Sequence, residues 1–399
     1  MSTLLRIDDP AARRRPAPAG WALWDLGFRP FYLLASIYAA LSVPLWAMQY
    51  AGWWGAHGLR APAWHAHEML FGYTLAVVVG FLFTAGRNWS GQPTPTGRAL
   101  MGLAGLWIAG RVLVYTPWTV ASFCANVAFP IAAALGLGRA LLAGSNRRND
   151  FFVAVLLGLA AAQGLLHATL AGWIALRPGL GLQLGLDAVL FVMAVMGGRV
   201  IPMFSNNGAP GTDARRHPTV ERVALGAVLA LAAADALQWH GAPLAALLIV
   251  ASLAHAARMA LWRPWRTRRV PLVWVLHAAY LWIALHLVLR AAAEMGWIGT
   301  TAATHALTAG AIGTLTLAMM TRTARGHTGR PLVAGRADVI AYCAVLAAAA
   351  LRVAVPLIAP AATVPALLVS GLLWSVAFAL YAWHYGPWLC RPRPDGRPG

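Results

Sequence analysis

The chain has 399 residues, of which 60% are hydrophobic and only 11% are charged, and its mean hydropathy is +0.63. This composition excludes a soluble domain with a polar surface and predicts an integral membrane protein in contact with the lipid bilayer. The formal net charge of +19 comes from 31 basic residues, all of them arginine. Most of these arginines lie in short gaps between apolar runs, a placement that favours a role in membrane topology over nucleic-acid binding.

About twelve apolar runs are long enough to cross a membrane, since a spanning helix needs roughly 20 residues. We expect an all-α membrane domain at 31–390, preceded by a basic segment at 1–30 and followed by a short tail at 391–399. The predicted spans are 31–50, 65–85, 97–116, 118–143, 151–176, 180–203, 219–240, 242–262, 271–293, 301–323, 335–358 and 364–386. The boundary between the third and fourth spans, at 115–118, is tight, so a merger of these two helices is the main alternative.

The arginines alternate from gap to gap along the chain. The segment before the first span and the even-numbered gaps hold nearly all of them, whereas the odd-numbered gaps hold only Arg60 and Arg177. Cytoplasmic loops are enriched in arginine and lysine, so this alternation places both termini in the cytoplasm. The same regularity independently predicts an even number of spans.

The second span begins with Trp-His-Ala-His-Glu-Met, which places His65, His67 and Glu68 in an otherwise apolar run. Ionisable groups at membrane depth are costly and usually mark function. At about 100° per residue, His65 and His67 lie roughly 200° apart on a helix and cannot bind one metal ion from the same turn. They serve two partners, or one lies just outside the helix. Because Glu68 is three residues from His65, we expect it to accept a hydrogen bond from His65 and orient that ring.

Several other polar residues share the outer half of the membrane with these two histidines. His305 begins an inward-running span, as His65 does, and His286 lies in the outer half of an outward-running span. Depth-matched imidazoles from different helices predict a buried cofactor or an aqueous vestibule, and neutral imidazole is a good ligand for haem iron, copper or zinc. The charged residues expected at this depth are Arg111, Asp187, Asp235, Arg290, Glu294 and Arg352. For His167, His240 and His277 we favour a simple hydrogen bond to a neighbouring helix.

Small residues lie on the same helix faces as the candidate ligands. Gly72, Ala76 and Gly80 follow His65, and Ala309 and Gly313 follow His305. Such faces admit either a flat macrocycle or another helix, and helix packing is at least as well favoured.

Five motifs together give the chain a recognisable pattern. They are Gly27-Phe28-Arg29-Pro30-Phe31, Trp64 to Met69, Gly197-Gly198-Arg199-Val200-Ile201-Pro202-Met203-Phe204, His305-Ala306-Leu307-Thr308 running to Arg322, and Gly326-His327-Thr328-Gly329-Arg330. In order and spacing they resemble the NnrS family of bacterial membrane proteins. The resemblance implies a twelve-span, haem-binding protein of the inner membrane, with copper also reported for the family, that is associated with nitric oxide and nitrosative stress.

The resemblance and the depth argument together define the expected site. We expect His305 and one or both of His65 and His67 to bind the metal of haem b, or copper as a second candidate. Glu68 is the expected catalytic residue, and Glu68, Asp187, Asp235 and Glu294 are the carboxylates expected to relay protons from the outer side. Further cofactor-binding residues are expected to be His286, Arg199, Arg322 and His327. For the segment 322–330 a positive-inside loop with a glycine turn is favoured over a clamp for an anion or haem propionate.

Three functions remain in competition. The leading one is binding or conversion of nitric oxide or a related nitrogen oxide, whose reduction would need an external electron donor because the sequence has no Cys-x-x-Cys-His haem motif. The second is transport of a metal, haem or small anion, which predicts inverted repeats and broken helices with sites at the membrane midplane. The third is an assembly factor for denitrification enzymes. Depth-matched histidines near one face favour the first.

Overall fold

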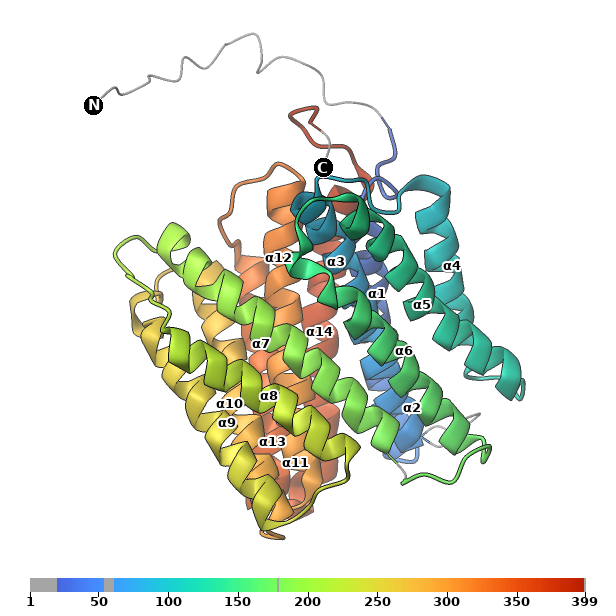
Figure 1. Cartoon of the computed structure of the whole chain (residues 1–399), viewed down its shortest axis with the longest axis vertical. Coiled ribbons are helices and arrows are strands. Elements are labelled where there is room, and N and C mark those ends of the chain that lie inside the picture. The colour runs from blue at the N-terminus through green and yellow to red at the C-terminus, as the bar shows by residue number, and fades with distance from the viewer. Residues whose placement is uncertain (1–19, 54–60, 178, 398–399) are drawn as a thin grey trace.

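The computed structural model describes residues 20–53, 61–177 and 179–397, and all regular elements in these ranges are helices (Figure 1). Two π-helices, η2 and η5, continue the axes of their flanking α-helices. The elements are α1 (Phe28–Tyr50), α2 (Ala61–His67), η2 (Glu68–Thr74), α3 (Leu75–Ser90), α4 (Gly97–Leu113), α5 (Thr119–Ala143), η3 (Arg147–Asn149), α6 (Phe151–Leu170), α7 (Leu180–Gly208), α8 (Pro218–Ala236), α9 (Ala242–Leu261), η4 (Pro264–Arg266), α10 (Pro271–Glu294), α11 (Thr300–His305), η5 (Ala306–Gly313), α12 (Thr314–His327), α13 (Arg336–Ile358), η6 (Pro360–Ala362) and α14 (Thr363–Cys390).

Ten helices in the described ranges are long and apolar enough to cross a membrane, so the chain is a multi-pass, all-helical membrane protein. Two further helices fall short of that standard. Helix α4 has only 17 residues, and α8 carries three ionisable residues, Glu221, Arg222 and Asp235. Helices α4 and α5 are separate, which confirms the predicted boundary between the third and fourth runs. The arginines at 13–15 and Arg60 lie outside the described residues.

The helices pack in a closed sequence around the molecule. Helix α1 packs against α14 and α3, α14 packs against α13, and the helices from α5 to α10 each pack against the next. Helix α10 also packs against α11, η5 and α12. The Ala22 backbone N–H donates to the Cys390 carbonyl at 2.9 Å, so the two ends of the helical domain lie side by side.

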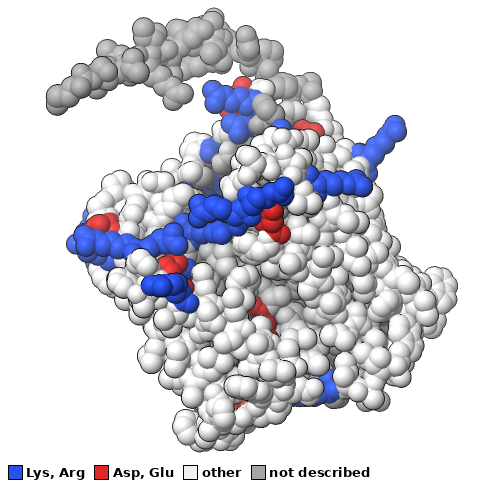
Figure 2. All heavy atoms as spheres, viewed as in Figure 1, with Lys and Arg blue, Asp and Glu red and all other residues white. Residues whose placement is uncertain are grey.

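Basic side chains gather toward the end of the molecule where the helical domain begins and ends. Figure 2 shows most arginine atoms in a band across the upper half, and below the band it shows a hollow with acidic atoms inside it. Because spanning helices must keep charge away from lipid, this band marks one boundary of the membrane-embedded region.

Three of the helices that carry sequence motifs are the most deeply buried. In the apolar cores of the helices at 62–90, 180–208 and 300–327, 83%, 72% and 67% of residues are buried, against 61% or less in the other apolar helices. Aromatic side chains of neighbouring helices pack directly against glycines of these helices. A Cβ atom on Gly80 would meet Phe31 and Tyr32, and one on Gly313 would meet Trp374. Helix packing, rather than a macrocycle, therefore accounts for these two small-residue positions.

Candidate metal centre

Both histidine motifs lie where an α-helix changes into a π-helix. Helix α2 ends at His67 and η2 begins at Glu68, while α11 ends at His305 and η5 begins at Ala306. π-Helical turns are rare and occur frequently at functional sites, because the wider turn re-aims the side chains that follow. The two helices thus depart from regular geometry directly beside the candidate ligands.

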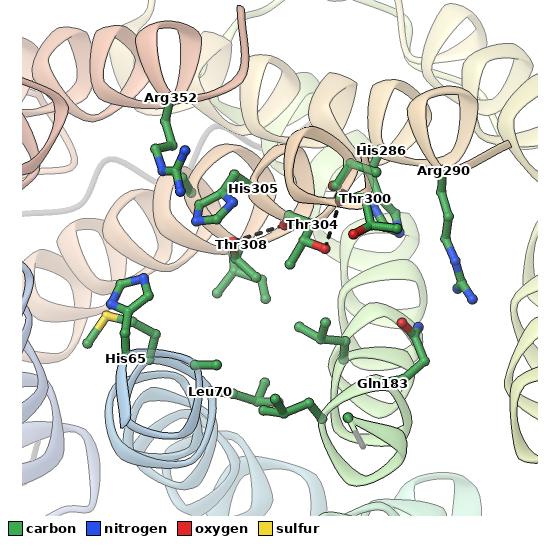
Figure 3. Close-up of a pocket in the computed structure, with 18 of the residues that line it drawn as sticks. His65, Leu70, Gln183, His286, Arg290, Thr300, Thr304, His305, Thr308 and Arg352 are labelled. Atoms are coloured by element: carbon green, nitrogen blue, oxygen red, sulfur yellow. Dashed lines mark hydrogen bonds between the residues drawn. The ribbon is translucent and has the colours of Figure 1, made fainter. Parts of the chain in front are cut away.

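His65 and His305 face each other across a gap, as Figure 3 shows. Their ring centroids are 6.4 Å apart and their planes differ by only 10°. The Trp46 ring stacks on His65 with a centroid distance of 4.0 Å. His305 Nδ1 lies 2.8 Å from the Thr301 carbonyl, which can only accept, so Nδ1 carries the proton. Nε2 of His305 is therefore the unprotonated nitrogen, the form in which imidazole binds a metal ion.

A cavity of about 380 Å³ extends from these two histidines. Its size falls within the range of about 300–1,000 Å³ that is usual for ligand sites. His286 lines it as well, with Nδ1 donating to the Ala303 carbonyl at 2.8 Å. Arg352 lies beside His305 (Figure 3), and among the described residues it forms no ion pair with a carboxylate. The cavity therefore combines two facing imidazoles with a cation that lacks a protein counter-ion.

The donor set of the cavity restricts which metal group it suits. In the described part of the chain, no three His, Cys, Asp or Glu side chains converge as a metal site. A zinc ion held by protein alone needs three or four such ligands. Two imidazoles suffice where a macrocycle supplies the remaining ligands, as it does for haem iron. The two imidazoles would therefore suit a haem, whose macrocycle would supply the other ligands.

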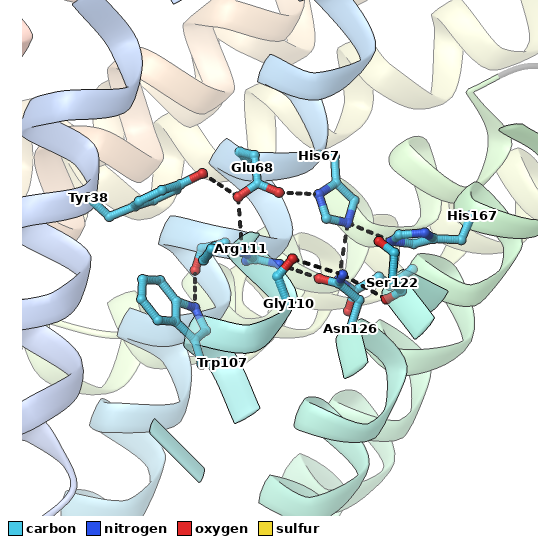
Figure 4. A network of polar contacts seen from close by, with 11 residues as sticks. Tyr38, His67, Glu68, Trp107, Gly110, Arg111, Ser122, Asn126 and His167 are labelled. Atoms are coloured by element: carbon cyan, nitrogen blue, oxygen red, sulfur yellow. Dashed lines mark hydrogen bonds and ion pairs between the residues drawn. The ribbon is translucent and has the colours of Figure 1, made fainter. Parts of the chain in front are cut away.

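His67 and Glu68 are fully buried and belong to a second polar network (Figure 4). His67 Nδ1 lies 2.6 Å from Glu68 Oε1, and Arg111 Nε lies 2.9 Å from Glu68 Oε2. The Tyr38 hydroxyl also donates to Glu68. The expectation that Glu68 orients His65 is therefore wrong, because the buried carboxylate is directed to the buried guanidinium that neutralises it. Neither Glu68 nor His67 lines the cavity.

The far side of His67 meets two residues of α6. His67 Nε2 lies 2.9 Å from His167 Nε2 and 3.3 Å from the Gln163 amide nitrogen. Asn126 on α5 completes the network by accepting from both Arg111 and Gln163. The hydrogen bond expected for His167 is confirmed, and its partner is the second histidine of the motif. With both ring nitrogens engaged by protein groups, His67 has no free position for a metal in this arrangement.

Three other predicted cofactor-binding residues lie away from the cavity and have partners of their own. Arg199 donates to Asn149 Oδ1 at 2.6 Å, and the Arg322 guanidinium lies 3.7 Å from the centre of the Phe204 ring. The His327 ring packs against Phe28, with a centroid distance of 5.6 Å. None of the three is among the residues that line the cavity. Their assignment to a cofactor at this cavity is not supported by their positions.

Contacts with neighbouring helices hold the segment 322–330 in place. Arg325 pairs with Asp338 at 2.7 Å. The Tyr385 hydroxyl accepts a hydrogen bond from Arg325 and donates one to Asp338. These contacts tie the end of α12 to α13 and α14. Most of the segment is therefore the end of α12, followed by a turn at 328–329, so the expected loop is wrong for 322–327, and these contacts do not leave an open anion clamp.

The Gly-Gly-Arg motif on α7 also has a structural explanation. A Cβ atom on Gly198 would overlap the Arg258 guanidinium, so only glycine fits there. Arg258 is buried and pairs with Glu221 at 2.8 Å and 2.5 Å, and it donates to the Ala194 carbonyl at 2.6 Å. The glycine makes room for a buried ion pair that joins α7, α8 and α9.

A family model described as "NnrS protein" matches residues 22–393, which include all the helices from α1 to α14. No curated protein matches the chain.

Proposed function

The chain belongs to the NnrS family, and on this premise we propose that it is a haem protein of the bacterial inner membrane that binds or converts nitric oxide or a related nitrogen oxide. The observation that carries the proposal is the pair of facing imidazoles, His65 and His305, in one cavity with Arg352, which has no carboxylate partner among the described residues. Family membership is consistent with a membrane metal protein linked to the nitric oxide response. The cavity is the place where we expect that chemistry.

The arrangement of the two rings supports a shared metal group. His65 and His305 would hold that group, because a neutral imidazole offers one nitrogen to a metal ion. The observed separation of His65 and His305 is 6.4 Å. Trp46 holds the His65 ring by stacking, and the Thr301 carbonyl fixes the His305 tautomer. A bound haem would supply iron as the binding atom for nitric oxide, and one of the two imidazoles would have to leave the iron for the gas to bind.

Two further features of the cavity suit this ligand. Arg352 beside His305 is positioned to pair with a carboxylate such as a haem propionate, since guanidinium groups bind carboxylates through paired hydrogen bonds. Apolar side chains including Leu70, Leu186 and Ile312 line the cavity. Nitric oxide is small and uncharged and partitions into lipid, so such a lining admits it without an aqueous channel. Any reduction would draw electrons from an external donor, and copper remains a second candidate metal.

The proposed topology has twelve spans with both termini in the cytoplasm. Helix α4, with 17 residues, is at the lower limit for crossing the hydrocarbon core. The charges on α8 are compatible with a membrane position because Glu221 pairs with Arg258 and Asp235 pairs with Arg290. With α4 and α8 counted as spans, the arginine-bearing loops alternate regularly, which supports the cytoplasmic assignment of the basic end.

The test is an absorption spectrum of the purified protein with metal analysis. We expect a Soret band that is lost or shifted in His305→Ala and in His65→Ala, and that is retained in the matched control His217→Ala, an exposed histidine in the basic loop before α8. Unchanged spectra in both cavity variants would remove this pair as ligands. A wild-type protein without a Soret band would favour the transporter or the assembly factor instead.

The ligand is tested by adding nitric oxide anaerobically to the reduced protein while recording the spectrum and the gas concentration. A spectral shift with consumption of the gas indicates conversion, and a shift without consumption indicates binding alone. No shift would refute nitric oxide as the ligand.

A further inference from the structure

Two buried carboxylates and one guanidinium meet at the end of the cavity away from His65. Asp187 on α7 is 3% exposed and Asp235 on α8 is 7% exposed. The Gln183 amide nitrogen donates to Asp187 Oδ1 at 2.9 Å and to Asp235 Oδ2 at 3.3 Å, so the two carboxylates are immediate neighbours. Arg290 on α10 forms an ion pair with Asp235, and its Nη1 lies 3.8 Å from Asp187 Oδ1.

The charges in this cluster do not balance. Arg290 is the single cation in contact with two carboxylates, and it bonds closely to Asp235. His286 and Glu294 of α10 line the same cavity, and so do Arg177 and His240. His240 lies 3.9 Å from Glu294, and Arg177 contacts His240 at 3.1 Å. Among the described residues neither Arg177 nor His240 forms an ion pair with Asp187 or Asp235. Asp187 Oδ2 is buried and has no hydrogen-bond partner. An ionised carboxylate oxygen without a partner in a low-dielectric interior is strongly disfavoured, and one proton shared by the pair removes that cost.

We propose that Asp187 and Asp235 form a proton-holding pair, which stores one proton at neutral pH and exchanges it with the cavity through Asp235. Asp235, Gln183 and Arg290 line the cavity, whereas Asp187 lies behind them. Figure 3 shows Gln183 and Arg290 across the cavity from His65. In the exchange one carboxyl O–H bond breaks and a new O–H bond forms on a water molecule in the cavity, and no electrons are transferred. The pair is then left as two carboxylates held by Arg290 and Gln183.

This proposal goes beyond the proposed metal chemistry and does not depend on which group the histidines bind. A pair of carboxylates that shares a proton gives up its first proton at a pH set by the pair rather than by either residue. The cavity would therefore have its own proton source, whatever reaction or transport step occurs there.

Infrared spectroscopy of the purified full-length protein tests the proposal. At neutral pH we expect a carbonyl stretch from one protonated carboxyl group, sensitive to exchange into heavy water. Asp187→Asn and Asp235→Asn should each abolish this band, because each leaves one carboxylate against Arg290. Arg290→Gln should instead increase it, because the pair loses its cation. The matched control is Asp213→Asn, an exposed carboxylate paired with Arg215, which should leave the band unchanged.

Each outcome decides the question. Loss of the band in either Asp→Asn variant supports the proposal, so one variant that fails to fold leaves the other as the test. Absence of the band from the wild type at neutral pH, or its persistence unchanged in both variants, would overturn it. The absorption spectrum of the same samples separates the two proposals, because a missing Soret band with an intact carboxyl band contradicts only the metal assignment.

Discussion

Replacing Glu68 with glutamine, which has nearly the same side-chain shape, should lower the free energy of unfolding strongly. Glu68 is fully buried, and its carboxylate neutralises Arg111, whose side chain is 7% exposed. Removing one member of a buried ion pair typically costs about 3–5 kcal/mol, because the other charge is left uncompensated. The glutamine oxygen can still accept from Tyr38, so we expect a loss near the lower end, about 3 kcal/mol in the free energy of unfolding.

A double variant isolates the charge effect from the loss of hydrogen bonds. In Glu68→Gln/Arg111→Met the unpaired cation is gone, and apolar replacement of a buried pair is often nearly neutral. Asn126 keeps its hydrogen bond from Gln163 at 3.1 Å, so the neighbouring network survives. We therefore expect the double variant to recover most of the stability lost in the single one. The control is Glu294→Gln, a partly exposed carboxylate at the cavity rim, with a loss below about 1 kcal/mol.

The assay is reversible unfolding in mixed micelles, followed by helix content and compared as a double-mutant cycle. The reasoning would be refuted by a single variant within about 1 kcal/mol of wild type, or by a double variant less stable than the single one.

Three further predictions concern packing, the basic loop and topology. Gly72→Ala should cost about 1–3 kcal/mol in the same assay, because its Cβ would lie 2.7 Å from Arg111 Nη1, whereas Gly102→Ala, with open space around it, should cost nothing. Asp338→Asn should lower stability by about 3 kcal/mol, since it leaves the buried Arg325 unpaired; an unchanged unfolding midpoint would contradict this. Reporter fusions after Gly55 and after Arg268 should report opposite sides of the membrane, and the same side for both would disprove the proposed topology.

The helices were predictable because their signal is local. An apolar run of about 20 residues bounded by arginine, glycine or proline is recognisable without any tertiary information. The division between His65 and His67 was predictable too, because helical rotation alone sends residues two apart to opposite sides. What rotation cannot supply is the identity of the partner on each side.

The partners were missed for physical reasons that particular residues illustrate. Asn126 and Gln163 are single uncharged amides in apolar runs, and they lie 37 and 96 positions from their partners Gln163 and His67. Nothing in the local sequence distinguishes them from packing residues. The π-helices could not be predicted, because Glu68–Thr74 and Ala306–Gly313 have the composition of an ordinary membrane helix. Their wider turns are a property of the assembled bundle.

The residues of the His-x-His-Glu motif lie within one turn of helix, but their side chains enter two different surroundings. His65 faces the cavity, while His67 and Glu68 face the network of Arg111 and His167. Only Ala66 separates the two imidazoles along the chain, so the contacts that fix His67 also fix the backbone from which His65 projects. Glu68 does not line the cavity, and it therefore acts on His65 through the position of the helix rather than by contact with a bound ligand. The buried ion pair of Glu68 and Arg111 therefore helps to hold His65 in place. Trp46 of α1 does the same by stacking directly on the His65 ring.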